Sequence, residues 1–246
     1  MAARALAWLR FFRIVNLPTV PGDVLVGAAA VVVAARRAAL TASDGVALAE
    51  AAAASCCVYL YGLADNDIVG APTDSGRPIP EGRISLRAAS VARALCWAAA
   101  LGFGAAAALP PLWWGVTLVT LLASAVYNRT KGAVVMGLCR GLNVLAGAAA
   151  LPIVLTGARH LWPIAFALVW TLYIGFVTKY SEGEETDPAR RCRVGFLIGA
   201  LVYLQLASLV TLTLLSSSVR PLLLAGGVLL VLLRLAKRLV PTVSAS

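Results

Sequence analysis

The chain has 246 residues, of which 61% are hydrophobic and 13% charged, and its mean hydropathy is +0.87. These values exclude a soluble globular domain, which could not hide so much apolar surface from water. The net charge of +10 would suggest nucleic-acid binding in a soluble protein, but here the basic residues stand in short segments between apolar runs, where they set membrane orientation. We therefore expect a polytopic membrane protein that binds no nucleic acid.

The first residues, 1–12, form a basic lead-in, "MAARALAWLRFF", that contains arginine but no acidic residue. This composition favours an amphipathic helix that lies on the membrane surface and contacts lipid. Residues 13–238 are expected to form a single transmembrane domain, and residues 239–246 a short C-terminal tail.

Eight apolar runs follow the lead-in, each long enough to cross a bilayer. Since a run of this length buries its backbone polar groups only as a helix, the fold class is all-α: a polytopic membrane bundle of about eight transmembrane helices. The expected helices are 13–34, 47–69, 88–109, 111–128, 133–155, 160–180, 194–216 and 219–236.

The loops between these runs divide into a basic and a less basic side. Fifteen of the 21 Lys and Arg residues fall on the side of the N-terminus and of the even-numbered loops, and four fall on the opposite side. By the positive-inside rule the N-terminus is cytoplasmic. We expect an integral protein of a bacterial inner membrane.

Three charged residues lie within the expected helices or at their starts. Arg93 is about 7 Å along its helix from the cytoplasmic end, so we expect its side chain to snorkel. Arg140 is roughly 10 Å in, and Asn143 shares its helix face. A charge at that depth faces either a wet cavity, which we favour, or a structural ion-pair partner. Asp23 follows Pro21 and Gly22, and we expect it to cap a helix start.

Two acidic clusters fall on the cytoplasmic side, each interleaved with basic residues. The first, Asp65 to Asp67, ends the second apolar run and leads into a loop with Asp74 and Arg77; the second spans 182–187. Hard carboxylate oxygens bind Mg²⁺, while cations neutralise phosphate oxygens. Two such clusters on one membrane face are what a magnesium-bridged diphosphate requires.

The first cluster also resembles a known family. The stretch "DNDIVGAPTDSGRPIPEGRIS", residues 65–85, resembles the first motif of the UbiA superfamily of intramembrane prenyltransferases, N-D-x-x-D-x-x-x-D followed by R-P-[IL]-P-x-G-x-[IV]-S. "RIVNLPTVPGDVLVGA" and "YNRTKG" are similar to its first helix and its basic loop. "MGLCRGLNVLAGAA" is similar to the fifth helix of the UbiA-like branch of ebo gene clusters.

The resemblance implies a bundle around a central cavity, in which Mg²⁺ and a prenyl diphosphate bind near the cytoplasmic face. An isoprenyl group would pass from the diphosphate to a lipophilic or aromatic acceptor embedded in the membrane. Carried over by position, the expected metal ligands are Asn66, Asp67, Asp74, Glu182 and Glu185. The expected substrate-binding residues are Asn16, Arg77, Arg129, Lys131, Asn143 and Lys179. The residues expected to act in catalysis are Asp67, Arg77 and Arg140.

The sequence departs from the family pattern at both metal motifs. Gly70 stands where the first motif has an aspartate, for which Asp65 could substitute, and the second motif is Glu-rich and has no pair of aspartates. Two alternatives to the transferase therefore stay open. One is terpene cyclisation on the same scaffold, and the other is a catalytically degenerate protein that binds or transports lipid.

Overall fold

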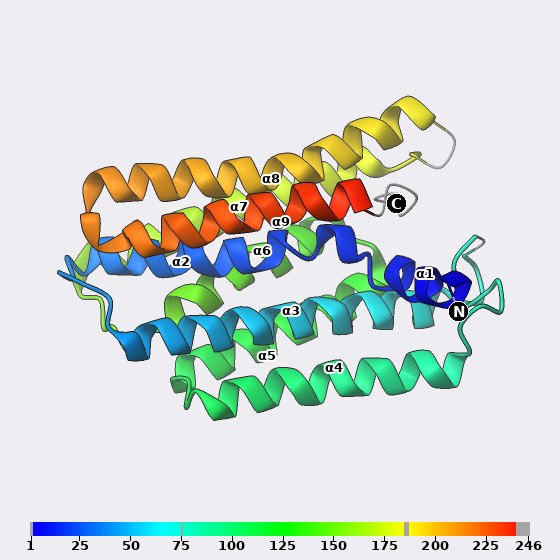
Figure 1. The fold of residues 1–246 in the computed structure, drawn as a ribbon, viewed down its shortest axis with the longest axis horizontal. Coiled ribbons are helices and arrows are strands. Elements are labelled where there is room, and N and C mark those ends of the chain that lie inside the picture. Colours follow the sequence, from blue (N-terminus) through cyan, green and yellow to red (C-terminus); the bar gives the residue numbers. More distant parts are fainter. Residues whose placement is uncertain (1, 75, 185–186, 240–246) are drawn as a thin grey trace.

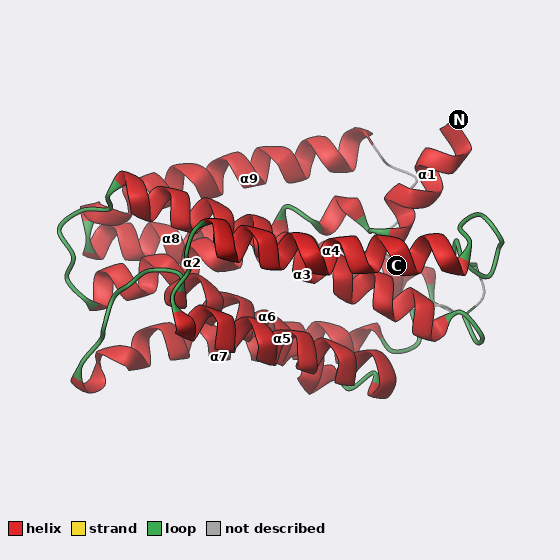
Figure 2. Cartoon of the chain, turned by 90° about the horizontal axis from the view of Figure 1, so that it is seen from below, coloured by secondary structure: helices red, strands yellow, loops and turns green. Residues whose placement is uncertain are grey.

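The computed structural model describes residues 2–74, 76–184 and 187–239, and within these ranges all regular structure is helical. The long helices run along one common direction and reverse at two ends, as Figures 1 and 2 show. The helices are α1 (Ala2–Phe11), α2 (Thr19–Ala34), α3 (Ala42–Gly70), α4 (Leu86–Ala106), α5 (Pro111–Thr130), α6 (Ala133–Ala149), α7 (Leu161–Ser181), α8 (Pro188–Leu215) and α9 (Arg220–Leu239), with short 3₁₀ turns at Ile14–Asn16, Gly157–His160 and Ser217–Val219.

The predicted all-α bundle is confirmed, and each of the eight predicted apolar runs contains one helix, α2 to α9. The count of eight membrane spans is not confirmed. Within the described residues six helical segments are long and apolar enough to cross a membrane, whereas α5 does not meet these conditions and α6, an apolar helix, is too short. The predicted tail 239–246 lies outside the described residues except for Leu239.

Three helices, α3, α4 and α8, begin earlier than their apolar runs because polar side chains cap them, and the shift is larger for α3 and α8 than for α4. Thr41 and Asp44 form a reciprocal capping box at the start of α3, and Arg37 lies 2.7 Å from Asp44. Asp187 accepts hydrogen bonds from the backbone N–H groups of Ala189 and Arg190 at the start of α8. Such caps satisfy backbone donors that the first turn leaves unpaired. Hydropathy cannot detect them.

Helix α2 lies at the centre of the bundle and is buried along almost its whole length. Glycines let α6 approach it in backbone contact: a Cβ added at Gly27 or Gly147 would lie about 2 Å from a carbonyl oxygen of the other helix. Gly137 and Gly141, four residues apart on α6, meet α7 in the same way. Small residues at such spacing are typical of helix contacts within membranes. They fix α6 against α2 and α7.

Helix α1 packs on the protein at the end of the bundle where α3 ends. Ala7 and Phe11 are almost fully buried and form a small apolar cluster with Ala64 of α3 and Ile84 of the following loop. The same end of the bundle holds the end of α3 and the start of α8 (Figure 1). The position of α1 on a membrane surface stays a prediction, but its most buried face contacts the chain itself.

Candidate functional site

A cluster of charged and polar side chains lies where α3 ends. Asp67, buried on the last turn of α3, forms an ion pair with Arg77 of the following loop, and Arg77 Nε is 3.0 Å from a carboxylate oxygen of Asp74. Arg13 lies 3.9 Å from Asp67, and Lys131 donates a hydrogen bond to the side-chain oxygen of Asn66. We call this set the mouth cluster: Arg13, Asn66, Asp67, Asp74, Arg77 and Lys131.

The mouth cluster carries a net positive charge. Its three cations, Arg13, Arg77 and Lys131, face two carboxylates, Asp67 and Asp74. The nearby acid Asp65 is neutralised separately by Arg93. One positive charge therefore remains for an anion, and arginine side chains suit the oxygens of phosphates.

Gly70 is explained by the position of Asp74. Asp74 donates its backbone N–H to the Gly70 carbonyl, at 2.8 Å, so that the chain turns back on the end of α3. A Cβ at position 70 would lie 2.4 Å from a carboxylate oxygen of Asp74. The Asp74 carboxylate thus occupies the space into which an aspartate at position 70 would project.

Lys131 follows α5 in a left-handed conformation, with φ of 54°, which turns its side chain back toward α3. Its side chain as a whole is exposed, but the ammonium lies against Asn66 and 5.8 Å from the centre of the Tyr127 ring. This partial burial lowers the pKa of Lys131; Arg77 and Arg13 lower it further, and Asp74 and Asp67 oppose them. Its charge is therefore more easily lost than that of a free lysine.

An elongated cavity begins at the mouth cluster and enters the bundle. Its empty space, including the open mouth, is about 650 Å³. Arg13 and Asn66 line the mouth, and Arg140 and Asn143 line the inner part. Between them the walls carry apolar and aromatic side chains, chiefly Val58, Tyr59, Leu63, Tyr127 and Met136.

Asp65 does not join the mouth cluster. It accepts a 2.7 Å hydrogen bond from Arg93 of α4 and another of 2.7 Å from Asn128 of α5. Arg93 therefore pairs with Asp65 instead of snorkelling, and Asp65 does not substitute for the missing ligand at Gly70. Asp65 ties α3 to α4 and α5, which positions its neighbours Asn66 and Asp67.

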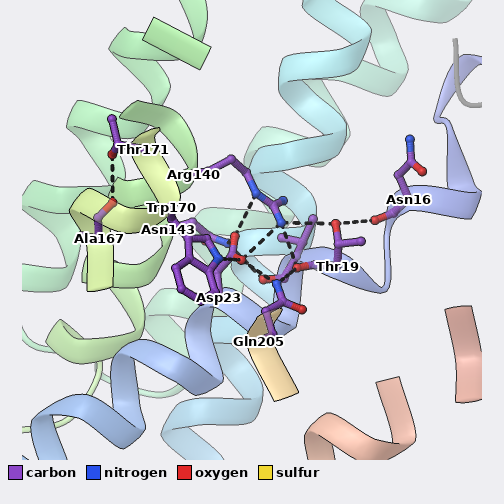
Figure 3. Close-up of polar contacts among 10 residues, drawn as sticks. Asn16, Thr19, Asp23, Arg140, Asn143, Ala167, Trp170, Thr171 and Gln205 are labelled. Atoms are coloured by element: carbon purple, nitrogen blue, oxygen red, sulfur yellow. Dashed lines mark hydrogen bonds and ion pairs between the residues drawn. The ribbon is translucent and has the colours of Figure 1, made fainter. Parts of the chain in front are cut away.

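The deepest polar group is Asp23, and it does not cap a helix start. It lies within α2 with none of its surface exposed. Arg140 Nε and Asn143 of α6 are each 3.0 Å from its Oδ2, while Trp170 of α7 and Gln205 of α8 each donate at 2.7 Å to Oδ1. Figure 3 shows these side chains converging on one carboxylate. From the sequence, Arg140 is expected to face either a cavity or an ion-pair partner. The structure places it in both environments, because it pairs with Asp23 and also lines the cavity.

Several other predicted site residues lie apart from the mouth cluster. Arg129 is exposed and donates to the Ala125 carbonyl of its own helix. Lys179 and Glu182 form an exposed ion pair with each other. Asn16 is buried beside the hydroxyl of Tyr59, which lines the cavity. Glu185 lies outside the described residues.

Sequence reasoning missed three residues of this region, Arg13, Tyr127 and Asn128. Arg13 contributes to the sequence analysis only as one of the basic residues that set the orientation, although its position between the basic lead-in and the first apolar run is a signal that could identify it. Tyr127 and Asn128 immediately precede the predicted Arg129, and their position in the "YNRTKG" segment was the signal that could have identified them.

The residues fit magnesium only as a partial set of ligands. Among the described residues no three His, Cys, Asp or Glu side chains lie close enough together to hold a metal. However, Asp67 and Asp74 both contact Arg77, so their carboxylates lie close together, with Asn66 adjacent to Asp67. Mg²⁺ commonly takes one or two carboxylates and completes its shell with water and substrate phosphate. The first cluster therefore fits such an ion without the second.

Comparisons with known proteins identify the fold. No protein-family model matches the sequence, and neither does any curated protein. Among solved structures, a UbiA homolog from Archaeoglobus fulgidus is 16% identical, with a TM-score of 0.55 over 96% of this chain and 87% of that chain. The same homolog bound to DMAPP and Mg²⁺ gives 0.54 with the same identity and coverage.

A structure of digeranylgeranylglyceryl phosphate synthase is 15% identical, with a TM-score of 0.56 over 98% of this chain and 96% of that chain. The similarity to all three structures covers nearly the whole chain. The chain therefore has the fold of the UbiA homologs, as the resemblance of its first motif implied.

Proposed function

We propose that the protein belongs to the UbiA superfamily and is an intramembrane prenyltransferase, which moves an isoprenyl group from a prenyl diphosphate to a lipophilic or aromatic acceptor. The observation that carries this proposal is the net-positive mouth cluster, two of whose residues, Arg13 and Asn66, also line a largely apolar cavity. An anionic head and an apolar tail on one molecule match these two surfaces. A solved structure with this fold is bound to DMAPP and Mg²⁺.

In the proposed reaction the mouth cluster binds the diphosphate and stabilises it as it leaves. Arg77 and Lys131 donate to its oxygens, and Asp67 holds Arg77 in place from the end of α3. The C–O bond to the isoprenyl group breaks with its electron pair on the diphosphate, the acceptor bonds to the freed carbon, and the acceptor loses one proton. Fixed cations that meet this growing negative charge lower the barrier.

Asp67, Asp74 and Asn66 would hold Mg²⁺, whose charge would further neutralise the leaving diphosphate. Arg77 contacts both carboxylates, so it lies beside the position that the ion would occupy. We further propose that the mouth cluster faces the cytoplasm of a bacterium and that the protein resides in the inner membrane, in line with the distribution of Lys and Arg between the loops.

A binding or transport protein without turnover is the second candidate, and one observation favours it. Within the described residues no group of three acidic or other metal-binding side chains forms at the mouth. Such a protein would bind the prenyl diphosphate and leave it intact. Terpene cyclisation would use the same mouth and cavity and would release diphosphate without needing an acceptor.

The test is a diphosphate-release assay on the purified protein in detergent, with Mg²⁺, radiolabelled geranylgeranyl diphosphate and a bacterial lipid extract as the source of acceptor. We expect release of diphosphate and a labelled lipid that forms only when the extract is present. Arg77→Ala and Asp67→Ala should abolish release. Arg83→Ala, which removes an exposed ion pair with Glu81 in the same loop, should leave it unchanged.

Intact diphosphate after prolonged incubation would favour the binding protein. A labelled hydrocarbon formed without extract would favour the cyclase. Normal release by both Arg77→Ala and Asp67→Ala would show that the mouth cluster is not the site.

A further inference from the structure

The two ends of the cavity differ in charge. The mouth is net positive, whereas the inner end is lined by Arg140 and Asn143 of α6 and by Ser55 of α3. Asn66 and Ser55, both lining residues, are eleven positions apart on α3, so the cavity extends about 16 Å along that helix at 1.5 Å per residue. A ligand that fills it meets two different polar surfaces.

Asp23 fixes the guanidinium of Arg140 and cancels its charge. Arg140 Nη2 donates to the Thr19 carbonyl at 2.9 Å and to Asp23 at 3.2 Å, while Nε faces the other Asp23 oxygen at 3.0 Å. Asn143, on the next turn of α6, donates to the Val20 carbonyl as well as to Asp23. The inner end is therefore rigid, and its net charge is zero.

Two donors at this inner end have no partner within the described residues. Arg140 Nη1 takes part in none of the hydrogen bonds or ion pairs that hold Nε and Nη2, and Figure 3 shows Arg140 among those partners. Ser55 is 6% exposed and lines the cavity, and no hydrogen bond of the described residues uses its hydroxyl. Because Arg140 and Ser55 both line the cavity, a ligand with an acceptor atom at this position would gain hydrogen bonds from these donors.

The charge balance determines which ligand group fits. An anion would lose its hydration and would meet a guanidinium already neutralised by Asp23, so its desolvation would not be offset. An uncharged oxygen has a far smaller desolvation cost and needs only the unused N–H and O–H groups. The diphosphate is thus favoured at the mouth and disfavoured at the inner end.

We propose that the inner end binds an uncharged oxygen of the prenyl acceptor, as in a hydroxyl, carbonyl or amide, and discriminates against carboxylates and phosphates. This inference rests on the proposed transferase function and specifies its acceptor class. The acceptor carries this oxygen at the end remote from the atom that is prenylated, because the reaction takes place beside the diphosphate. Asp23 is a positioning residue: it determines both the direction and the net charge of Arg140.

The test compares two probes of nearly equal shape, 2-naphthamide, which is neutral, and 2-naphthoate, which is anionic. Their affinities for the purified full-length protein are measured by calorimetry at pH 7.5 in one detergent. The ratio of the two affinities is determined for the wild type and for Asp23→Asn, and the two ratios are compared. Because both proteins are measured in the same detergent, the partition of the probes into micelles cancels. Removing the Asp23 charge leaves Arg140 cationic, and we expect the ratio to shift toward naphthoate by at least tenfold.

Ser55→Ala provides a second variant that leaves the buried ion pair intact. It should weaken naphthamide binding by about fivefold, the effect of one net hydrogen bond, and it remains informative if Asp23→Asn does not fold. An unchanged probe ratio in folded Asp23→Asn, or unchanged naphthamide affinity in Ser55→Ala, would overturn the inference.

Binding of inorganic diphosphate with Mg²⁺ is titrated separately and should depend on Arg77 and not on Asp23. Absence of diphosphate binding would count against the proposed function, whereas the probe ratio tests the acceptor class alone. The two failures are therefore distinguishable.

Discussion

Removing Arg140 should destabilise the protein far more than removing an exposed arginine. Asp23 is completely buried, and in Arg140→Met it keeps hydrogen bonds from Asn143, Trp170 and Gln205 but loses the one counter-charge that it has among the described residues. Breaking a buried ion pair from one side costs about 3–5 kcal/mol, because it leaves an uncompensated charge in a medium of low dielectric. In this variant the Thr19 carbonyl still accepts a hydrogen bond from Gln205 at 2.7 Å. Most of the loss of stability therefore comes from the Asp23 carboxylate, which has lost its ion-pair partner.

A double-mutant cycle isolates this contribution. Asp23→Asn removes the charge with little change in shape, so Asp23→Asn/Arg140→Met should be more stable than the sum of the two single losses predicts, by roughly 2 kcal/mol or more. Free energies of unfolding are measured by titration with SDS in mixed micelles, followed by tryptophan fluorescence. Arg83→Met, which removes an exposed pair with Glu81, is the control and should lose less than about 1 kcal/mol. Additive single losses would refute the account of Asp23 and Arg140 as one ion pair.

Two further predictions concern the mouth cluster. Gly70→Ala places a Cβ 2.4 Å from the Asp74 carboxylate and should displace that carboxylate from Arg77, so the affinity for Mg²⁺ and diphosphate should fall while the fold persists. Gly102→Ala is the matched control, because no atom lies within 4 Å of its added Cβ. Equal calorimetric affinities of the two variants would contradict the expected role of Gly70. The lowered pKa of Lys131 means that its positive charge is lost as the pH rises through a value below the pKa of a free lysine, so the affinity for diphosphate should fall over that alkaline range. Lys131→Arg, which stays protonated, should abolish the fall. An identical pH profile in both proteins would exclude Lys131 as a ligand of the diphosphate.

The sequence was sufficient to predict the helices but not their partners. Apolar runs identified α2 to α9 because the bilayer imposes one length and one polarity on every spanning segment. Helix starts such as that of α3 were missed because Thr41 and Asp44 are polar yet helical, held by the capping box. Hydropathy also could not show that α6 is too short to meet the length expected of a membrane span.

Most residues of the mouth cluster are named by the sequence pattern, and their role in binding stays a prediction, whereas the inner network has no such local pattern. Asn66, Asp67, Asp74 and Arg77 belong to one local motif, so their proximity follows from the turn at the end of α3. The contact between Asp23 and Arg140 joins positions 117 residues apart. It depends on glycine contacts between α2 and α6, which local patterns do not report. For this reason the sequence indicates a helix cap at Asp23 and allows two environments for Arg140.

The most direct measurement is an experimental structure of the protein with Mg²⁺ and geranylgeranyl S-thiolodiphosphate, a donor analogue that resists ionisation. The account predicts that the diphosphate contacts Arg77 and Lys131, that the metal lies at Asp67 and Asp74, and that the isoprenyl chain begins in the cavity below Asn66. A diphosphate bound elsewhere, or an analogue held with its chain outside this cavity, would contradict it.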